Sequence, residues 1–119
     1  ADADAILEAA APAIAANLFA TAGILADLDF RLTATDAVIV HPADRTPDRL
    51  VATTRAAWTP STILSVFADA ADLPPTHPAS GKRPVDDLPT AYVCHGETCS
   101  LPVTDPDTLA MLLRDPRSA

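Results

Sequence analysis

Three stretches in the middle of the chain decide its fold: Ala37-Val-Ile-Val-His41, Thr46-Pro47-Asp48 and Ser61-Thr-Ile-Leu-Ser-Val-Phe67. The first and third are short apolar runs rich in β-branched residues, which is typical of buried strands. The second has the composition of a helix start, and helical periodicity follows it. A strand, a helix and a strand make a βαβ unit. We therefore predict parallel strands joined by a right-handed crossover.

The helix of this unit is predicted to end at Thr59-Pro60. Thr46 has a side chain suited to the N-cap, and Pro47 fits the first turn because its missing N–H has no partner there. One helical face carries the residues that we expect to pack on the sheet, among them a tryptophan that we place in the core: Leu50, Val51, Thr54 and Trp58.

The region after Pro89 has the pattern of a β-hairpin. Residues 90–94 and 98–103 are strand-like runs on either side of His95-Gly96-Glu97. Gly96 supplies the positive φ that a tight turn needs. With the turn at Gly96-Glu97, Cys94 lies opposite Cys99, and their Cα atoms are expected about 4.5 Å apart.

The last predicted element is a short helix. Thr104 is the expected N-cap and Pro106 lies in the first turn, with Asp107 favourable at the positive helix end. The helix is predicted to stop at Asp115-Pro116, and its apolar residues are Leu109, Leu112 and Leu113.

The N-terminal region has helical periodicity over residues 3–31. Pro12 lies inside it, so we predict two helices with a break between Ala10 and Asn17. Residues 1–32 are expected to form a helical segment, and residues 33–119 a small α/β domain. Within that domain, five prolines and Gly81 predict a long connector over residues 68–89.

The predicted fold class is therefore α/β. It consists of an N-terminal helical pair, a βαβ unit with parallel strands, a β-hairpin and a C-terminal helix, arranged as a layered α/β sandwich.

The two cysteines, Cys94 and Cys99, are the redox candidates, and three interpretations stay open. They could pack as two small apolar thiols, form a reversible disulfide, or hold a metal. A bridge across so short a loop would stabilise little and would be easily reduced. A structural zinc site needs four protein ligands. His95 points away from Cys94 on the strand, and His41 and His77 are far away in sequence.

Acidic side chains form a second candidate group. They could line the mouth at the carboxyl ends of the parallel strands, where open α/β sheets bind ligands. The alternative is an ordinary solvated acidic surface. The residues are Asp69, Asp72, Asp86, Asp87 and Glu97.

Composition excludes several classes of function. The chain has 16 Asp and Glu against 8 Lys and Arg, so its net charge is −8 and nucleic-acid binding is not expected. The apolar run over residues 9–26 is interrupted by Pro12 and Asn17, so a membrane-spanning helix is not expected either. There is no Gly-rich phosphate loop and no nucleophile elbow. No catalytic residue or cofactor is predicted, and the expected compartment is the cytoplasm.

One motif is similar to that of a known family. It begins with Ala91-Tyr-Val-Cys94, continues through four residues to Cys99, and ends with Pro102-Val-Thr-Asp-Pro106. Gly81-Lys82 and Pro89-Thr90 precede it. This pattern resembles the C-terminal end of the YyaL, or spermatogenesis-associated protein 20, family. Those proteins begin with a thioredoxin-like domain and continue into an α/α-toroid.

The resemblance implies a function without chemistry of its own. The chain would be a non-catalytic C-terminal accessory domain of a larger thioredoxin-domain-containing protein, with the toroid as its partner. Residues 5–32 carry more aliphatic surface than a small sheet needs, so self-association through them is the other expected contact. Two alternatives remain: a thiol-disulfide switch or weak metal site at Cys94 and Cys99, and a stand-alone protein-interaction module.

Overall fold

The computed structural model describes residues 2–57, 59–68, 73–77 and 79–115. The chain forms two compact units, Ala1–Thr33 and Ala34–Ala119. The division follows Thr33, one residue later than the sequence predicted. Trp58, Asp69 and Asp72 lie outside the described residues, and so do the expectations placed on them.

The first unit is a pair of helices, α1 (Asp2–Ala16) and α2 (Ala22–Thr33). Arg31 bridges to Asp4 across the pair, with 2.8 Å between Nε and Oδ1. This hydrogen bond, with the charge of the guanidinium, lowers the pKa of Asp4.

The predicted pair of helices is confirmed, but the break lies at the far end of the predicted interval between Ala10 and Asn17, because Pro12 lies inside α1 and the helix ends at Ala16. Asn17 makes the break instead. Its Oδ1 accepts the N–H of Ala20 at 3.1 Å, and its carbonyl accepts the Thr21 hydroxyl at 2.7 Å. Proline removes one helical hydrogen bond, whereas an Asn side chain offers the backbone a competing turn.

The second unit contains a four-stranded sheet in the order β2-β1-β3-β4. The strands are β1 (Thr35–His41), β2 (Thr62–Ala68), β3 (Thr90–His95) and β4 (Thr98–Cys99). Strands β1 and β2 are parallel, as the βαβ pattern predicted, and β3 adds antiparallel to the other side of β1. Residues 37–40 of β1 are fully buried, because this strand is central and covered on both faces.

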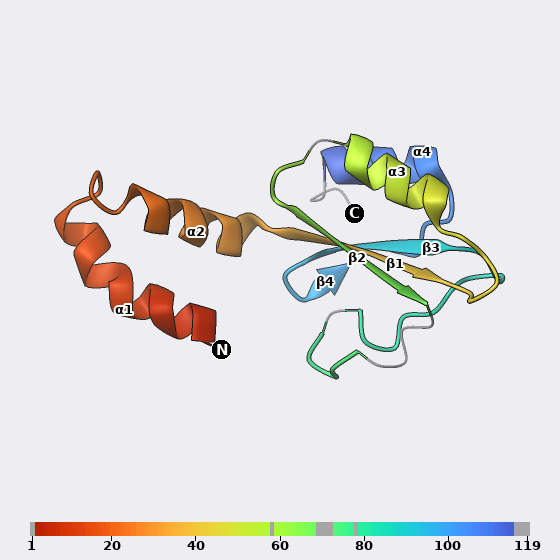
Figure 1. The fold of residues 1–119 in the computed structure, drawn as a ribbon, viewed down its shortest axis with the longest axis horizontal. Coiled ribbons are helices and arrows are strands. Elements are labelled where there is room, and N and C mark those ends of the chain that lie inside the picture. Colours follow the sequence, from red (N-terminus) through yellow and green to blue (C-terminus); the bar gives the residue numbers. More distant parts are fainter. Residues whose placement is uncertain (1, 58, 69–72, 78, 116–119) are drawn as a thin grey trace. The chain divides into compact units, whose positions relative to one another are not determined.

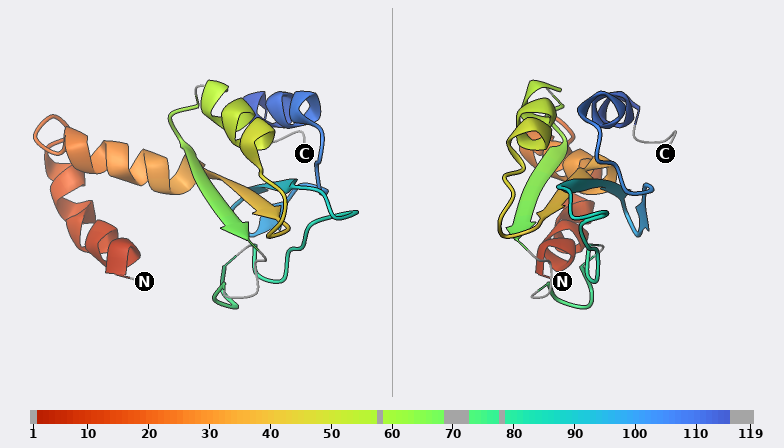
Figure 2. Two further views of the ribbon diagram at one scale, coloured as in Figure 1. Left: turned by 45° about the vertical axis from the view of Figure 1, so that its right-hand side comes forward. Right: turned by 90° about the vertical axis from the view of Figure 1, so that its right-hand side faces the viewer.

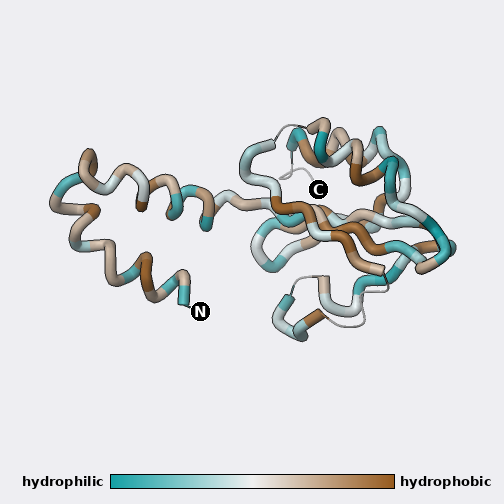
Figure 3. Tube along the Cα trace, viewed as in Figure 1, coloured by the Kyte–Doolittle hydropathy of each residue, from teal (hydrophilic) through white to brown (hydrophobic). Residues whose placement is uncertain are grey.

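Two helices, α3 (Asp48–Ala56) and α4 (Pro106–Arg114), lie side by side on one face of the sheet (Figure 1; Figure 2). Hydrophobic stretches, brown in Figure 3, run along the strands beneath them. The core on this face, called here the helix-side core, consists of Ala37, Ile39, Leu50, Ala91, Val93, Val103, Leu109 and Leu113.

The opposite face is covered by the long connector rather than by a helix. Its core consists of Val38, Val40, Ala79, Tyr92 and Cys94. The Tyr92 hydroxyl donates to the carbonyl of Arg83 at 2.8 Å, and the Lys82 ammonium lies 5.1 Å from the centre of the Tyr92 ring. The layered α/β class is confirmed, with helices as one outer layer and a proline-rich segment as the other.

Both predicted helix caps are wrong by one residue. Pro47, not Thr46, occupies the cap position of α3, and no side chain caps that helix. In α4, Asp105 replaces Thr104, because its Oδ2 accepts both the N–H and the hydroxyl of Thr108 at 2.8 Å. A carboxylate is a stronger acceptor than a hydroxyl and suits the positive helix end.

The Asp105 cap should make stability depend on pH. The hydrogen bonds from Thr108 lower the pKa of Asp105 below its usual 3.8. A lowered folded-state pKa means that the stabilisation is complete above about 3.8 and is lost as the pH falls through the lower folded value. We expect Asp105→Asn, which still accepts the cap hydrogen bond, to reduce the acid dependence of unfolding below about pH 4.

Urea unfolding at a series of pH values measures this effect. Asp107→Asn is the matched control, since it removes a charge from the same helical turn without removing the cap. If the free energy of unfolding of Asp105→Asn fell with decreasing pH as steeply as that of the wild-type chain, Asp105 would not be the cap responsible for the acid dependence.

The predicted strand over residues 98–103 is also wrong. Strand β4 has two residues, and pairing resumes only at the bridge between Ala91 and Val103. The register there is shifted by one residue relative to the pair Cys94–Cys99, which is the signature of a bulge. Ser100 occupies the interruption, and its hydroxyl accepts the N–H of Val93 at 3.1 Å.

Candidate functional site

The β3–β4 hairpin brings the two cysteines together as predicted. Cys94 pairs with Cys99 and His95 with Thr98, so the turn consists of Gly96 and Glu97. Gly96 has φ +60, a conformation that residues with a side chain rarely adopt.

The structure joins Cys94 and Cys99 in a disulfide, with sulfurs 2.06 Å and Cα atoms 3.9 Å apart. Of the three interpretations, the disulfide is therefore the one present. Cys94 is fully buried and belongs to the core on the connector side of the sheet, while Cys99 is partly exposed. Thiol–disulfide exchange begins with attack of an external thiolate on a sulfur that it can reach. Exchange at this hairpin would start at Cys99 and leave Cys94 as the departing thiolate.

The three histidines do not form one cluster, because His95 and His41 lie at opposite ends of the sheet. His95 is exposed at the end of β3, beside Thr35 at the start of β1. His41 ends β1 at the opposite end of the sheet, with Nδ1 2.8 Å from the Pro42 carbonyl. His77 packs edge-on against Phe67, with ring centres 6.3 Å apart, and accepts the Ala79 N–H. Within the described part of the chain, no three His, Cys, Asp or Glu residues group to hold a metal.

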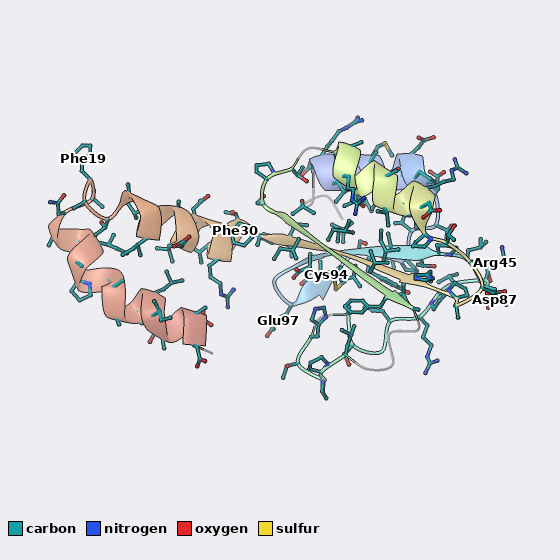
Figure 4. The ribbon with its side chains drawn as sticks, viewed as in Figure 1. Phe19, Phe30, Arg45, Asp87, Cys94 and Glu97 are labelled. Carbon is teal, nitrogen blue, oxygen red and sulfur yellow. A yellow bond between two sulfur atoms is a disulfide. The ribbon has the colours of Figure 1, made fainter. Side chains whose placement is uncertain are left out.

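The predicted acidic mouth is not assembled as expected. Asp86 and Asp87 lie in a turn just before β3, whereas Glu97 lies in the turn that follows it. Because the two turns precede and follow the same strand, they are at opposite ends of the sheet (Figure 4). Glu97 therefore cannot act with the other two carboxylates. Asp86 and Asp87 precede Thr90, which pairs with Val40, so they do lie at the carboxyl end of β1, where Arg45 also lies (Figure 4).

A hairpin turn at Asp86 and Asp87, in the described part of the connector, was not predicted from the sequence. Asp86 and Asp87 have φ values of 52 and 55, and they are flanked by the bridge between Val85 and Leu88. Two successive left-handed residues are the mark of a type I′ hairpin turn, and aspartate is among the residues that tolerate it. The buried Thr90 hydroxyl holds the turn by accepting the Val85 N–H and donating to the Leu88 carbonyl, both at 2.9 Å.

The described residues of the α/β unit line hollows on its surface, and two of them are well defined. One, of about 350 Å³, lies between the end of α3 and the edge strand β2; its described lining is Thr54, Arg55, Thr59, Pro60, Thr62 and Leu64. The other, of about 230 Å³, lies where α3 and α4 begin; its described lining is Thr46, Pro47, Arg49, Leu50, Leu88, Pro89, Thr104 and Pro106. These linings contain an arginine each and no described carboxylate, imidazole or thiol. Each offers space, threonine hydroxyls and one cation, without a described general base that could activate a hydroxyl.

The helical pair presents a hydrophobic surface of its own. No described residue of α1 or α2 is buried. Phe19, in the turn between the helices, is 96% exposed and projects outward (Figure 4). The other large apolar residues exposed on this unit are Ile6, Leu18, Phe30 and Leu32. This set, together with Phe19, is called here the hairpin surface; it belongs to the helical hairpin of α1 and α2 and not to the β3–β4 hairpin.

Neither α1 nor any other described helix has the length and hydropathy needed to cross a bilayer. The described residues offer the disulfide hairpin, the hairpin surface and the edge of the sheet as candidate features. No known protein family, curated protein or solved structure matches this chain.

Proposed function

We propose that this chain is a non-catalytic accessory domain that docks through its hairpin surface onto the helical part of a larger protein. One observation carries the proposal: α1 and α2 bury none of their described residues, while Phe19, Leu32 and Ile6 are 96%, 69% and 68% exposed. Helices of 15 and 12 residues are marginal in water without tertiary packing. A partner that covers their apolar side chains would supply that packing.

The size of the effect supports docking. Covering roughly 300 Å² of apolar surface contributes about 7 kcal/mol before the entropy of association is subtracted. Contiguous exposed apolar patches larger than this mark interaction surfaces on soluble proteins. The Arg31–Asp4 salt bridge, whose side chains are 57% and 50% exposed, links the two helices without burying an apolar side chain of either.

The resemblance of the Ala91–Pro106 motif supports the identity of the partner. In proteins of the YyaL type the neighbouring element is an α/α-toroid, whose outer helices could pack against α1 and α2. The same resemblance supports a cytoplasmic parent protein, in which glutathione and thioredoxin would keep most thiol pairs reduced.

Binding in trans tests the docking proposal. The toroid of a YyaL-type protein, made separately, is titrated into the full chain by calorimetry. We expect Phe19→Asp to weaken binding by about tenfold or more, because a charge would be buried in the contact. Met111→Asp is the matched control, since Met111 is a 64% exposed apolar residue on α4, in the other unit.

The possible results separate the partners. Absence of binding by the wild-type chain, or an equal loss in Met111→Asp, would refute docking on the toroid. Sedimentation of the chain alone tests the remaining occupant, a second copy held through residues 5–32, which Phe19→Asp should also weaken.

A second candidate function is a thiol-disulfide switch at Cys94 and Cys99. The observation that favours it is the disulfide between a buried and a partly exposed cysteine, which gives an external thiol one point of attack. Reduction would release the β4 end of the hairpin, because β4 contributes two residues to the sheet. The stability measurement in the Discussion tests whether this bond matters to the fold.

A further inference from the structure

We infer that strand β2 is an open docking edge and that its occupant is β2 of a second copy of this chain, added antiparallel about a twofold axis at Ser65. This contact is separate from the hairpin surface and does not depend on the proposed function.

The edge is open on one side. Strand β2 lies at one edge of the sheet, and among the described residues it pairs with β1 alone (Figure 2). An edge strand turns backbone N–H and C=O groups toward solvent, and these can receive another strand. Ile63 and Val66 are each 41% exposed, although both are β-branched residues suited to a sheet interior.

The usual protections of an edge are missing from β2. Natural edge strands carry charges, prolines or bulges, or are very short. Strand β2 has seven residues, Thr62–Ala68, and none of them is charged or proline. The opposite edge is protected: β4 has two residues and is followed by the bulge at Ser100 and by Pro102. The contrast marks β2 as the edge left available for pairing.

The sequence of β2 is complementary to itself. In an antiparallel pair centred on Ser65, Leu64 lies opposite Val66 of the second copy, and Ile63 lies opposite Phe67. The register with β1 places Leu64 and Val66 on the helix side, beside Ala37 and Ile39. Ile63 and Phe67 fall on the connector side, because side chains alternate along a strand. Apolar residues therefore meet on both faces of the joined sheet.

On the helix side there is space for a side chain of the added strand. The hollow of about 350 Å³ is lined by Thr62 and Leu64 of β2 and by Thr54 and Arg55 of α3. Val66 of the second copy, opposite Leu64, would point toward this hollow. The axis is perpendicular to the sheet, so both copies keep their helices on the same face and form one eight-stranded sheet.

The charge of the chain favours a neutral contact of this kind. Each copy has a net charge of −8, so two copies repel each other at long range. This repulsion is screened beyond about 8 Å at physiological salt, and the uncharged β2 edges add no like-charge pair. The dimer should therefore strengthen as salt is raised from low concentration.

A charge-swap experiment tests the twofold axis. Ser65→Lys places two ammonium groups opposite each other across the axis, and Ser65→Glu does the same with two carboxylates. In sedimentation experiments on the full chain, we expect either variant alone to raise the dimer dissociation constant by about a hundredfold. Mixing the two variants should restore association, because lysine then faces glutamate.

Leu101→Lys is the matched control. Leu101 is 83% exposed beyond the opposite edge of the sheet, so the same added charge there should leave the dimer unchanged. Ile63→Lys provides a second variant at a more exposed position of β2, should Ser65→Lys fail to fold. Phe19→Asp, which alters the hairpin surface, should not change this dimer, so failure of the docking proposal is distinguishable from failure of this one.

Three results would overturn the inference. The first is a wild-type chain that stays monomeric at a concentration of about 1 mM, where contacts worth only about 4 kcal/mol become populated. The second is a dimer that is unaffected by both Ser65→Lys and Ile63→Lys. The third is a mixture of folded Ser65→Lys and Ser65→Glu chains that does not associate, which would mean that β2 receives a strand of another protein or none.

Discussion

Ile39→Ala is expected to lower the free energy of unfolding of the α/β unit by about 2–5 kcal/mol. Ile39 is fully buried in the middle of β1, the strand that pairs with both β2 and β3. Its side chain belongs to the helix-side core, together with Leu50 of α3 and Leu109 of α4. The truncation leaves a cavity that a close-packed sheet and two helices cannot fill without moving.

Urea unfolding followed by circular dichroism measures the change. Met111→Ala is the matched control, because Met111 is 64% exposed on α4 and truncating it should change stability by less than about 0.5 kcal/mol. Since small domains are stable by about 5–15 kcal/mol, the loss at Ile39 is a large fraction of the total. Equal losses in the two variants would contradict the core assignment.

Removing the disulfide is expected to have the next largest effect on folding stability. The double variant Cys94→Ala/Cys99→Ala should have a free energy of unfolding about 2 kcal/mol lower than the oxidised wild-type chain. The effect is limited because a cross-link between residues five apart removes little chain entropy from the unfolded state. The wild-type chain should be more stable than the double variant only while its disulfide is intact. After reduction with a thiol, the wild-type chain should unfold at nearly the same urea concentration as the double variant.

Thiol titration under native and denaturing conditions completes this test. The oxidised chain should show no reactive thiol in either condition, and the reduced chain should show Cys99 reacting before the buried Cys94. If reduction left the stability unchanged, the bond would be irrelevant to the fold, and a switch acting through local unfolding of β4 would lose its basis.

Local pattern predicted most of the elements. The runs at Ala37-Val-Ile-Val-His41 and Ser61–Phe67 are strands because β-branched residues favour a pleated, buried backbone. Gly96 predicted the turn, and through it the pairing of Cys94 with Cys99, because the hairpin register follows from the turn position. These features depend on residues close together in the chain, which is why the sequence alone was enough for them.

Competition between local signals explains the errors at element ends. Pro12 suggested a helix break, but the hydrogen bonds of Asn17 make it five residues later. Thr104 and Asp105 both suit an N-cap, and the choice depends on which side chain reaches the N–H of Thr108. Such choices differ by about 1 kcal/mol, which sequence patterns do not resolve.

Tertiary structure alone decided the strand order and, with it, the candidate sites. Nothing local states that β3 adds beside β1 rather than β2, yet this choice leaves β2 at the edge. It also brings the turn with Asp86 and Asp87 to the end of the sheet where β1 finishes, and Glu97 to the end where β1 begins. Strand order depends on contacts between residues far apart in the chain, whose closure entropy and packing are properties of the whole fold. The residue types were therefore readable from the sequence, whereas their neighbours were settled only when β1 became the shared central strand.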